Sequence, residues 1–137
     1  YLVTNPDAYK VTQVDTIIHA YTGPEIVTGS TRMKAGTATK LILNMISTTT
    51  MIQLGKVYKN FMIDLMAVNN KLIDRGTRII SELTGLDYAE AKIRLFSADK
   101  SVKVAVVMEI LDCSNKEAKN KLKSVDGFLY KLINTKK

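Results

Sequence analysis

The sequence predicts an α/β fold in which helices predominate. Two short runs rich in β-branched and aromatic residues, 1–4 and 16–21, come first and are typical of strands. A long apolar segment with helical spacing follows, which suggests the far side of an α/β sheet. Beyond Gly85 the pattern changes to short segments that begin with helix-capping residues, so we expect a small helical bundle at the end of the chain.

The composition indicates a globular protein. The chain has 137 residues, of which 46% are apolar, enough to bury a core in one domain or slightly more. Its net charge of +7 is spread evenly, with +3 over residues 1–86 and +4 over residues 87–137. The sequence contains no block of Lys and Arg and no alternation of basic and aromatic residues. A solvated, lysine-rich surface is therefore favoured over a nucleic-acid interface.

Cysteine and histidine usage bears on the compartment. The single cysteine, Cys113, excludes an internal disulfide framework, and with the single histidine, His19, it offers no zinc-ligand cluster. A reducing compartment, the cytoplasm, is the natural prediction. No apolar run approaches the roughly 18 residues that span a bilayer, and no secretory signal pattern is present. The chain opens at Tyr1 inside an apolar run, so we expect it to be a piece of a longer protein.

Two short strands are the first predicted elements. The run 1–4 ends at the turn signal Asn5-Pro6-Asp7, and the run 16–21 ends at Gly23-Pro24. His19 lies inside the second run. Because no conspicuous partner lies near it in sequence, a neutral histidine packed in or beside a sheet is favoured over a catalytic one.

The stretch 23–40, GPEIVTGSTRMKAGTATK, suits the binding of an anion. It combines a Gly-Pro turn and small hydroxyl residues with the start of a helix, whose exposed amides carry about half a positive charge. Arg32 and Lys34 would add full charges. Glu25 is the only acid in the stretch; it either contacts a ligand, orients Arg32 or Lys34, or balances the local cations.

Two long helices are expected next. The first runs from about Thr31 to Gly55 and is apolar on more than one face, so we expect it to be buried on more than one side. The state of residues 56–66 is left open. The second runs over 69–84 with Gly85 at its C-terminal cap, and its mid-helix Gly76 indicates the close approach of another backbone.

The last part of the chain is expected to form short helices. Capping boxes are indicated by Asp87 with Glu90 and by Ser114 with Glu117, and an apolar segment lies between them at 101–111. After Gly127 a last turn or two presents further apolar residues. A bundle of this size is too small to be very stable alone, so we expect it to dock on what precedes it.

Sequence motifs exclude several kinds of site. Five residues rather than four separate Gly23 from Gly29, and no lysine follows the second glycine, so a nucleotide-binding P-loop is excluded. No GxSxG, HExxH or CxxC pattern is present. Cys113 lies in an apolar context that is more typical of an inert core thiol than of a nucleophile.

Several motifs resemble those of the N-acetylmuramic acid 6-phosphate etherases. The match is most specific in TGPE and in TGSTRMKAGTA, and it continues over nearly the whole chain. The matching positions are residues 22–25, 28–38, 40–41, 43–45, 55–58, 60, 62, 64, 69, 71–72, 75 and 84–85. The glucokinase regulatory protein of animals has a similar GSTRMK-like stretch, but the downstream match and the helical tail favour the bacterial etherases.

The resemblance implies a fold, an activity and partners. It implies a cytoplasmic lyase of cell-wall recycling that converts N-acetylmuramic acid 6-phosphate to N-acetylglucosamine 6-phosphate and D-lactate, as a homodimer, without metal or nucleotide. The implied fold is a sugar isomerase (SIS) α/β sandwich followed by a helical domain similar to ubiquitin-associated domains. On this basis residues 1–68 are the C-terminal part of the SIS domain, 69–85 a connecting helix and 86–137 the helical domain.

The resemblance also assigns site residues. We expect substrate-pocket roles for Glu25, Ser30, Thr31, Arg32 and Lys34. The family's catalytic acids lie in earlier motifs that are not found here, so the chain alone is expected to be inactive. For Arg32 and Lys34, a salt bridge to another part of the protein or to a partner subunit remains an alternative. A noncatalytic sugar-phosphate sensor and a pure interaction module remain alternatives for the chain.

Overall fold

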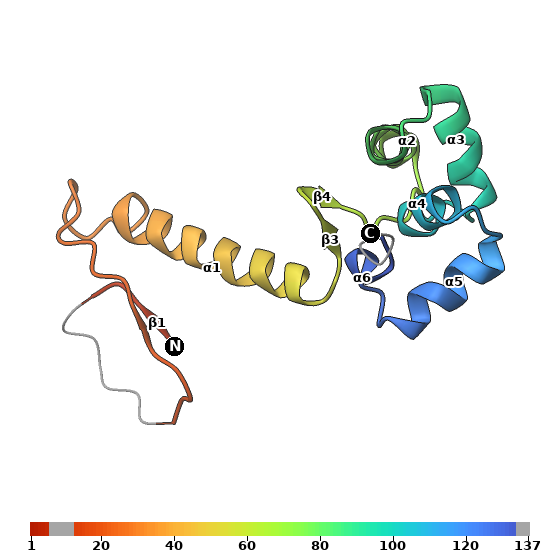
Figure 1. Ribbon diagram of the computed structural model, residues 1–137. Helices are drawn as coiled ribbons and strands as arrows, with labels where there is room; N and C mark the ends of the chain where they lie inside the picture. The colour runs from red at the N-terminus through yellow and green to blue at the C-terminus, as the bar shows by residue number, and fades with distance from the viewer. Residues whose placement is uncertain (6–12, 134–137) are drawn as a thin grey trace. The chain divides into compact units, whose positions relative to one another are not determined.

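The computed structural model describes residues 1–5 and 13–133, and its regular structure is mostly helical, with a few short strands. The chain divides into two compact units, Tyr1–Thr50 and Met51–Lys137. The turn predicted at residues 5–7 lies largely outside the described residues. Within residues 1–5 and 13–133, none of the helices combines the length and apolar character needed to cross a membrane. The prediction of a helix-rich chain is confirmed (Figure 1).

Two short strands pair in parallel in the first unit. Strand β1 is Leu2–Val3 and strand β2 is Ile18–His19, with Leu2 opposite Ile18 and Val3 opposite His19. The N–H of Ala20 donates to the carbonyl of Val3 over 2.8 Å. Both predicted strands are confirmed, in shorter form. Because the pairing is parallel, the chain leaves both strands at the same edge.

Helix α1, Lys34–Gln53, begins one turn later than predicted because residues 31–33 form a turn. None of its residues is buried. Leu41 and Met45, on the predicted apolar face, are 57% and 60% exposed. The expectation that this helix is buried on more than one side is therefore not met within the described residues of Tyr1–Thr50, where no element packs closely enough to cover it.

A β-hairpin follows α1. Gly55 adopts a positive φ of 65° after the last helical turn, as its predicted position at the helix end requires. Strand β3, Val57–Tyr58, then pairs antiparallel with strand β4, Phe61–Met62. The two-residue loop between them needs left-handed backbone, which Lys59 supplies with a φ of 53°. The segment whose state the sequence left open is thus a hairpin.

Helix α2, Asn70–Thr84, confirms the predicted bounds. The side chain of Asn69 accepts from the N–H of Leu72 over 2.9 Å, and Gly85 ends the helix with a φ of 82°. Gly76 allows a close approach, as predicted, but the neighbour is a side chain rather than a backbone. A Cβ at Gly76 would lie only 2.8 Å from Cγ2 of Val102.

Four shorter helices complete the second unit: α3 (Tyr88–Ser97), α4 (Val102–Ile110), α5 (Asn115–Ser124) and α6 (Leu129–Ile133). Both predicted capping boxes are present, at the starts of α3 and α5. Helix α4 is central, since every residue from Val102 to Met108 is buried. It contacts α2, α3, α5 and α6 (Figure 1). Contacts of α2 with α3 and α4 confirm that the short helices dock on the helix before them.

Candidate ligand-binding site

A cavity of about 360 Å³ opens at the carboxyl edge of strands β1 and β2, within the first unit. Three segments meet there: the residues that follow β1, the loop that follows β2, and the first turns of α1. In parallel α/β sheets, ligands bind at this edge, outside the carboxyl ends of the strands. The lining residues are Thr4, Asn5, Thr22, Gly23, Pro24, Glu25, Thr31 and Ala35.

The carboxylate of Glu25 holds the start of α1. Its Oε2 accepts from the N–H of Lys34 and its Oε1 from the N–H of Ala35, each over 3.0 Å. These backbone hydrogen bonds, that of Lys34 first, lower the pKa of Glu25 below its usual value. The carboxyl group is therefore an ionised acceptor at neutral pH. The amides that the sequence suggested for an external anion are, at these two positions, bound by Glu25 instead.

Lys34 binds the loop that forms one wall of the cavity. Its Nζ donates to the carbonyl oxygen of Pro24 over 2.8 Å, while its backbone N–H donates to Glu25. The side chain is exposed and lies outside the cavity lining. Two hydrogen bonds from Lys34 thus connect the helix start to the Gly-Pro turn. This is the arrangement expected if Glu25 orients Lys34.

The remaining predicted site residues divide into two groups. Thr31 lines the cavity, and its carbonyl accepts from the N–H of Gly36 over 3.0 Å. Ser30 closes a turn, its N–H donating to the carbonyl of Val27 over 3.0 Å, and lies outside the lining, as does the exposed Arg32. Of the five predicted residues, the structure therefore brings Glu25 and Thr31 to the cavity wall.

Sequence reasoning missed three lining residues, Thr4, Asn5 and Thr22. Thr4 ends the first predicted strand, Asn5 follows it directly, and Thr22 follows the second. A signal was available, because two parallel strands bring the segments that follow them to one edge. The pairing direction, however, could not be read from two short runs.

Neither His19 nor Cys113 is among the residues that line this cavity. His19 lies in β2 but is exposed, so the prediction of a packed histidine is wrong; its Nδ1 lies 2.9 Å from the hydroxyl of Tyr21. Cys113 is half-buried, and burial raises the pKa of its thiol. This agrees with an inert thiol. Within the described part of the chain, no three His, Cys, Asp or Glu residues are grouped to hold a metal ion.

The arrangement can bind a polar ligand. Three threonines, one asparagine and Glu25, whose carboxylate is fixed by two hydrogen bonds, line a cavity of about 360 Å³. That volume lies at the lower end of the range of about 300 to 1,000 Å³ for small-molecule sites. Glu25 is the only described carboxylate on its wall, and its hydrogen bonds favour the ionised form.

Comparisons with known proteins point to a class of enzyme. No family model matches the chain. Curated relatives that match most of its length are named as etherases, enzymes that cleave ether bonds. The class agrees with the motif-based interpretation.

These relatives are N-acetylmuramic acid 6-phosphate etherases. The one from Oceanobacillus iheyensis is 52% identical over 127 residues, which are 93% of this chain and 42% of that protein. The one from Shouchella clausii is 48% identical over 96% of this chain and 45% of that protein. The one from Brucella anthropi is 46% identical over 99% of this chain and 44% of that protein. The recognition from the motifs is confirmed: the chain resembles a portion of these etherases and spans less than half of their length.

Proposed function

We propose that the chain forms part of an etherase that cleaves the D-lactyl ether of N-acetylmuramic acid 6-phosphate, giving N-acetylglucosamine 6-phosphate and D-lactate. One observation carries the proposal: the cavity at the strand edge is walled by residues 22–25, 31 and 35, which belong to the motifs shared with the etherases. The names of the relatives supply the substrate class. On this proposal, the cavity is one side of the sugar-phosphate pocket.

The charges of the site suggest how such a substrate would lie. The ionised Glu25 repels a phosphate but accepts hydrogen bonds from sugar hydroxyl or amide groups. The phosphate would then lie toward the exposed Arg32 and the Ser30 hydroxyl, with Thr31 between the two ends. Lys34 would act on the substrate mainly by fixing the loop at Pro24.

The chain supplies binding rather than proton transfer on this proposal. Elimination of lactate and addition of water need carboxyl groups that exchange protons. Glu25 is poorly suited to that task because two backbone N–H groups stabilise its charged form. The catalytic acids would come from another part of the enzyme, so the chain alone would be inactive.

The fold assignments belong to the same proposal. Residues 1–68 would end a SIS-type sandwich, 69–85 would connect, and 86–137 would form a domain similar to ubiquitin-associated domains. The exposed apolar side chains of α1 support this, because they call for a covering layer from the sandwich or from the partner in a homodimer. The absence of a disulfide framework in the sequence favours the cytoplasm.

A second candidate is a noncatalytic sugar-phosphate-binding regulatory protein, similar to the glucokinase regulatory protein. The observation that favours it is the fixed, ionised state of Glu25 on a wall that has no other described carboxylate. Both candidates bind a sugar phosphate. They differ in whether D-lactate is released.

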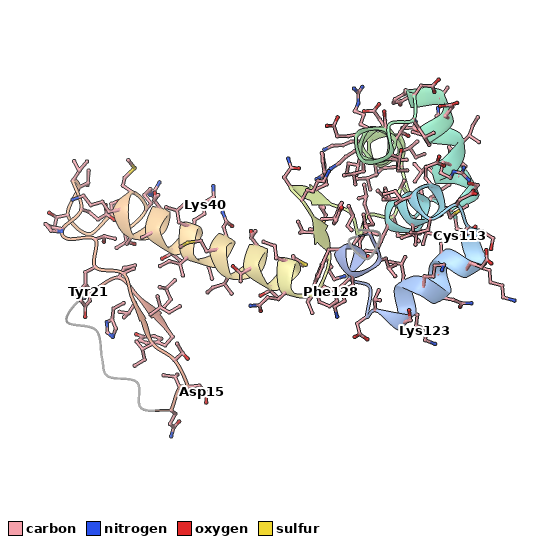
Figure 2. All side chains as sticks on the ribbon, viewed as in Figure 1. Asp15, Tyr21, Lys40, Cys113, Lys123 and Phe128 are labelled. Carbon is pink, nitrogen blue, oxygen red and sulfur yellow. The ribbon has the colours of Figure 1, made fainter. Side chains whose placement is uncertain are left out.

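Binding is tested by calorimetry of residues 1–137 with N-acetylglucosamine 6-phosphate. Arg32→Ala and Thr31→Ala should weaken binding about tenfold or more, since a hydrogen bond to a charged group contributes about 1.5–3 kcal/mol. Lys40→Ala, an exposed cation of α1 outside the cavity lining, is the matched control and should bind unchanged (Figure 2). An equal loss of affinity in the Lys40 variant would show that the sugar phosphate is held by nonspecific attraction to positive charge.

Catalysis is tested in a chimera. The matched segment of this chain replaces its counterpart in the Oceanobacillus iheyensis etherase, which it matches over 127 residues. We expect release of D-lactate from N-acetylmuramic acid 6-phosphate by the chimera and none by the chain alone. Binding without release by a folded chimera would favour the regulatory candidate. If neither protein bound the sugar phosphate, the proposed pocket would be wrong.

A further inference from the structure

A lysine is buried in the second unit, Met51–Lys137, called the helical unit below. Lys103, in the first turn of α4, is only 8% exposed, between the buried Val102 and Val104. An ammonium group removed from water costs several kcal/mol unless it is paired and hydrogen-bonded. A lysine among the core residues of the unit therefore requires partners that satisfy its charge.

Three oxygen atoms surround this ammonium. Nζ of Lys103 donates to the carbonyl of Gly55 and to the carbonyl of Gly127, each over 3.1 Å, and lies 3.4 Å from Oδ1 of Asp64. An ammonium has three N–H donors and no acceptor, so three oxygens match its capacity. The carboxylate of Asp64 also bonds Nζ of Lys56 at 2.5 Å, which fixes its orientation.

The three oxygens come from segments far apart in the sequence. Gly55 links α1 to the hairpin, Asp64 follows strand β4, and Gly127 lies between α5 and α6. Both glycines have positive φ, 65° and 77°. A Cβ at Gly55 would lie 2.9 Å from the ring of Phe128, so Gly55 also packs closely against the residue just before α6 (Figure 2 labels Phe128). One charged group thus joins the hairpin, α4 and the turn before α6.

We propose that the three oxygens of Gly55, Asp64 and Gly127 form a specific ammonium-binding site. By occupying this site, Lys103 stabilises the packing of the hairpin and α6 against the helical bundle. The proposal does not rest on the proposed function. Many buried ion pairs can be exchanged for apolar residues without loss. Here such an exchange would remove the charged donor of two backbone carbonyls, which no apolar side chain replaces, and would leave Asp64 paired with Lys56.

The first test is chemical rescue. Lys103→Ala removes the atoms from Cγ to Nζ, which propylammonium replaces in size and charge. We expect amide exchange of residues 55–64 and 125–133 to accelerate on the order of a hundredfold in the variant, from the loss of hydrogen bonds to a charged donor. Addition of propylammonium should restore at least about tenfold of this protection. Tetramethylammonium, which has no N–H donor, should restore nothing at the same ionic strength.

The matched control is Lys119→Ala. This lysine also pairs with a carboxylate, that of Asp99 at 2.6 Å, but its side chain is 51% exposed. Its loss should change exchange less than about threefold, and propylammonium should have no effect. The proposal is overturned if Lys103→Ala keeps wild-type protection, or if it loses protection and propylammonium and tetramethylammonium act alike.

A second test does not use Lys103→Ala and therefore decides the question even if that variant fails to fold. In the unaltered chain, the two hydrogen bonds to Gly55 and Gly127 and the ion pair with Asp64 should slow the exchange of the Nζ protons of Lys103. We expect one lysine ¹H–¹⁵N correlation to persist at neutral pH while those of exposed lysines such as Lys119 vanish. Asp64→Asn, which keeps an oxygen but removes the charge, should speed this exchange. Absence of any persistent lysine signal would overturn the proposal.

Discussion

The two compact units differ in where their apolar side chains lie. Among residues 1–5 and 13–50, Val3 alone is buried. In Met51–Lys137, buried residues of the hairpin region and of α2–α6 form one continuous core. Both units contain long apolar stretches, so composition does not explain the contrast. The two units differ in whether the described residues include helices or strands that pack over the apolar side chains.

Helices α1 and α4 make this contrast concrete. Both are rich in apolar residues on several faces. Helix α4 is covered on all sides by α2, α3, α5 and α6, which lie within about 30 residues of it in sequence. Helix α1 has exposed leucine, isoleucine and methionine side chains along its length. Apolar residues on several faces of a helix therefore indicate that the helix is buried, but the pattern does not identify the segment that packs against it.

The largest expected effect comes from comparing the loss of a buried apolar side chain in α2 with the loss of an exposed one in α1. Ile80→Ala, at a position with no exposure in α2, should destabilise the helical unit by about 3 kcal/mol through lost burial and a new cavity. Leu41→Ala removes a comparable side chain from α1 and should cost less than about 0.5 kcal/mol in the chain by itself. Native-state hydrogen exchange, read in α4 and in α1, measures both.

A large cost of Leu41→Ala would contradict this comparison, because it would mean that α1 is already covered in solution. Measuring the effect at several protein concentrations separates the explanations. A cost that grows with concentration points to a second copy of the chain as the cover.

The next effect tests how tightly α2 and α4 meet. Gly76→Ala should gain about 1 kcal/mol of helix propensity but lose more through overpacking, typically about 1–3 kcal/mol. The new Cβ would lie 2.8 Å from Cγ2 of the fully buried Val102, a stiff β-branched side chain. We therefore expect net destabilisation of about 1 kcal/mol. Denaturant unfolding measures it.

A double variant isolates that contact. Val102→Ala removes the opposing methyl groups, so Gly76→Ala should be neutral or stabilising in this background. Equal effects of Gly76→Ala in both backgrounds would show that the cost comes from another neighbour, such as Leu95, whose Cδ2 lies 3.5 Å from the added atom.

Local rules predicted the helical unit well. The boundaries of α2, α3 and α5 follow from capping residues such as Asn69, Asp87 and Ser114, whose hydrogen bonds reach only three residues ahead. The hairpin was not predicted because, although Asn60 in its loop is a common turn residue, the positive φ falls on Lys59, which has no such preference. The burial of Lys103 also gave no signal, since its three oxygens are set by tertiary packing.

The candidate site was predictable in part, for a related reason. The helix start and the Gly-Pro turn are local features that marked the stretch 23–40, and the resemblance to the etherases assigned Glu25 and Thr31 within it. The wall made by Thr4 and Asn5 depends on the parallel pairing of β1 with β2. The capture of the first α1 amides by Glu25 joins residues nine and ten positions apart, beyond the range of capping rules.

An effect of similar size tests a cap inside the helical unit. Ser114→Ala breaks the capping box at the start of α5, where the N–H of Glu117 donates to Oγ of Ser114 over 3.3 Å. We expect a loss of about 1 kcal/mol, measured by thermal or denaturant unfolding. Asn120→Ala, exposed on the same helix, is the control and should be neutral or slightly stabilising. If Ser114→Ala changed the free energy of unfolding no more than Asn120→Ala does, the cap would contribute nothing to α5.

The smallest expected effect lies in the first unit and depends on pH. The pKa of Glu25 is lowered in the folded chain by the N–H groups of Lys34 and Ala35, so its stabilisation of the α1 start is complete above the usual value of 4.5. It is lost as pH falls through the lowered pKa of the folded state. Amide exchange at Lys34 and Ala35, corrected for intrinsic rates, should lose protection in this acid range, while Glu25→Gln should show weak protection at every pH. Constant protection of the unaltered chain down to pH values well below 4.5 would show that Glu25 does not hold the helix start, and the wall of the candidate site would then need another support.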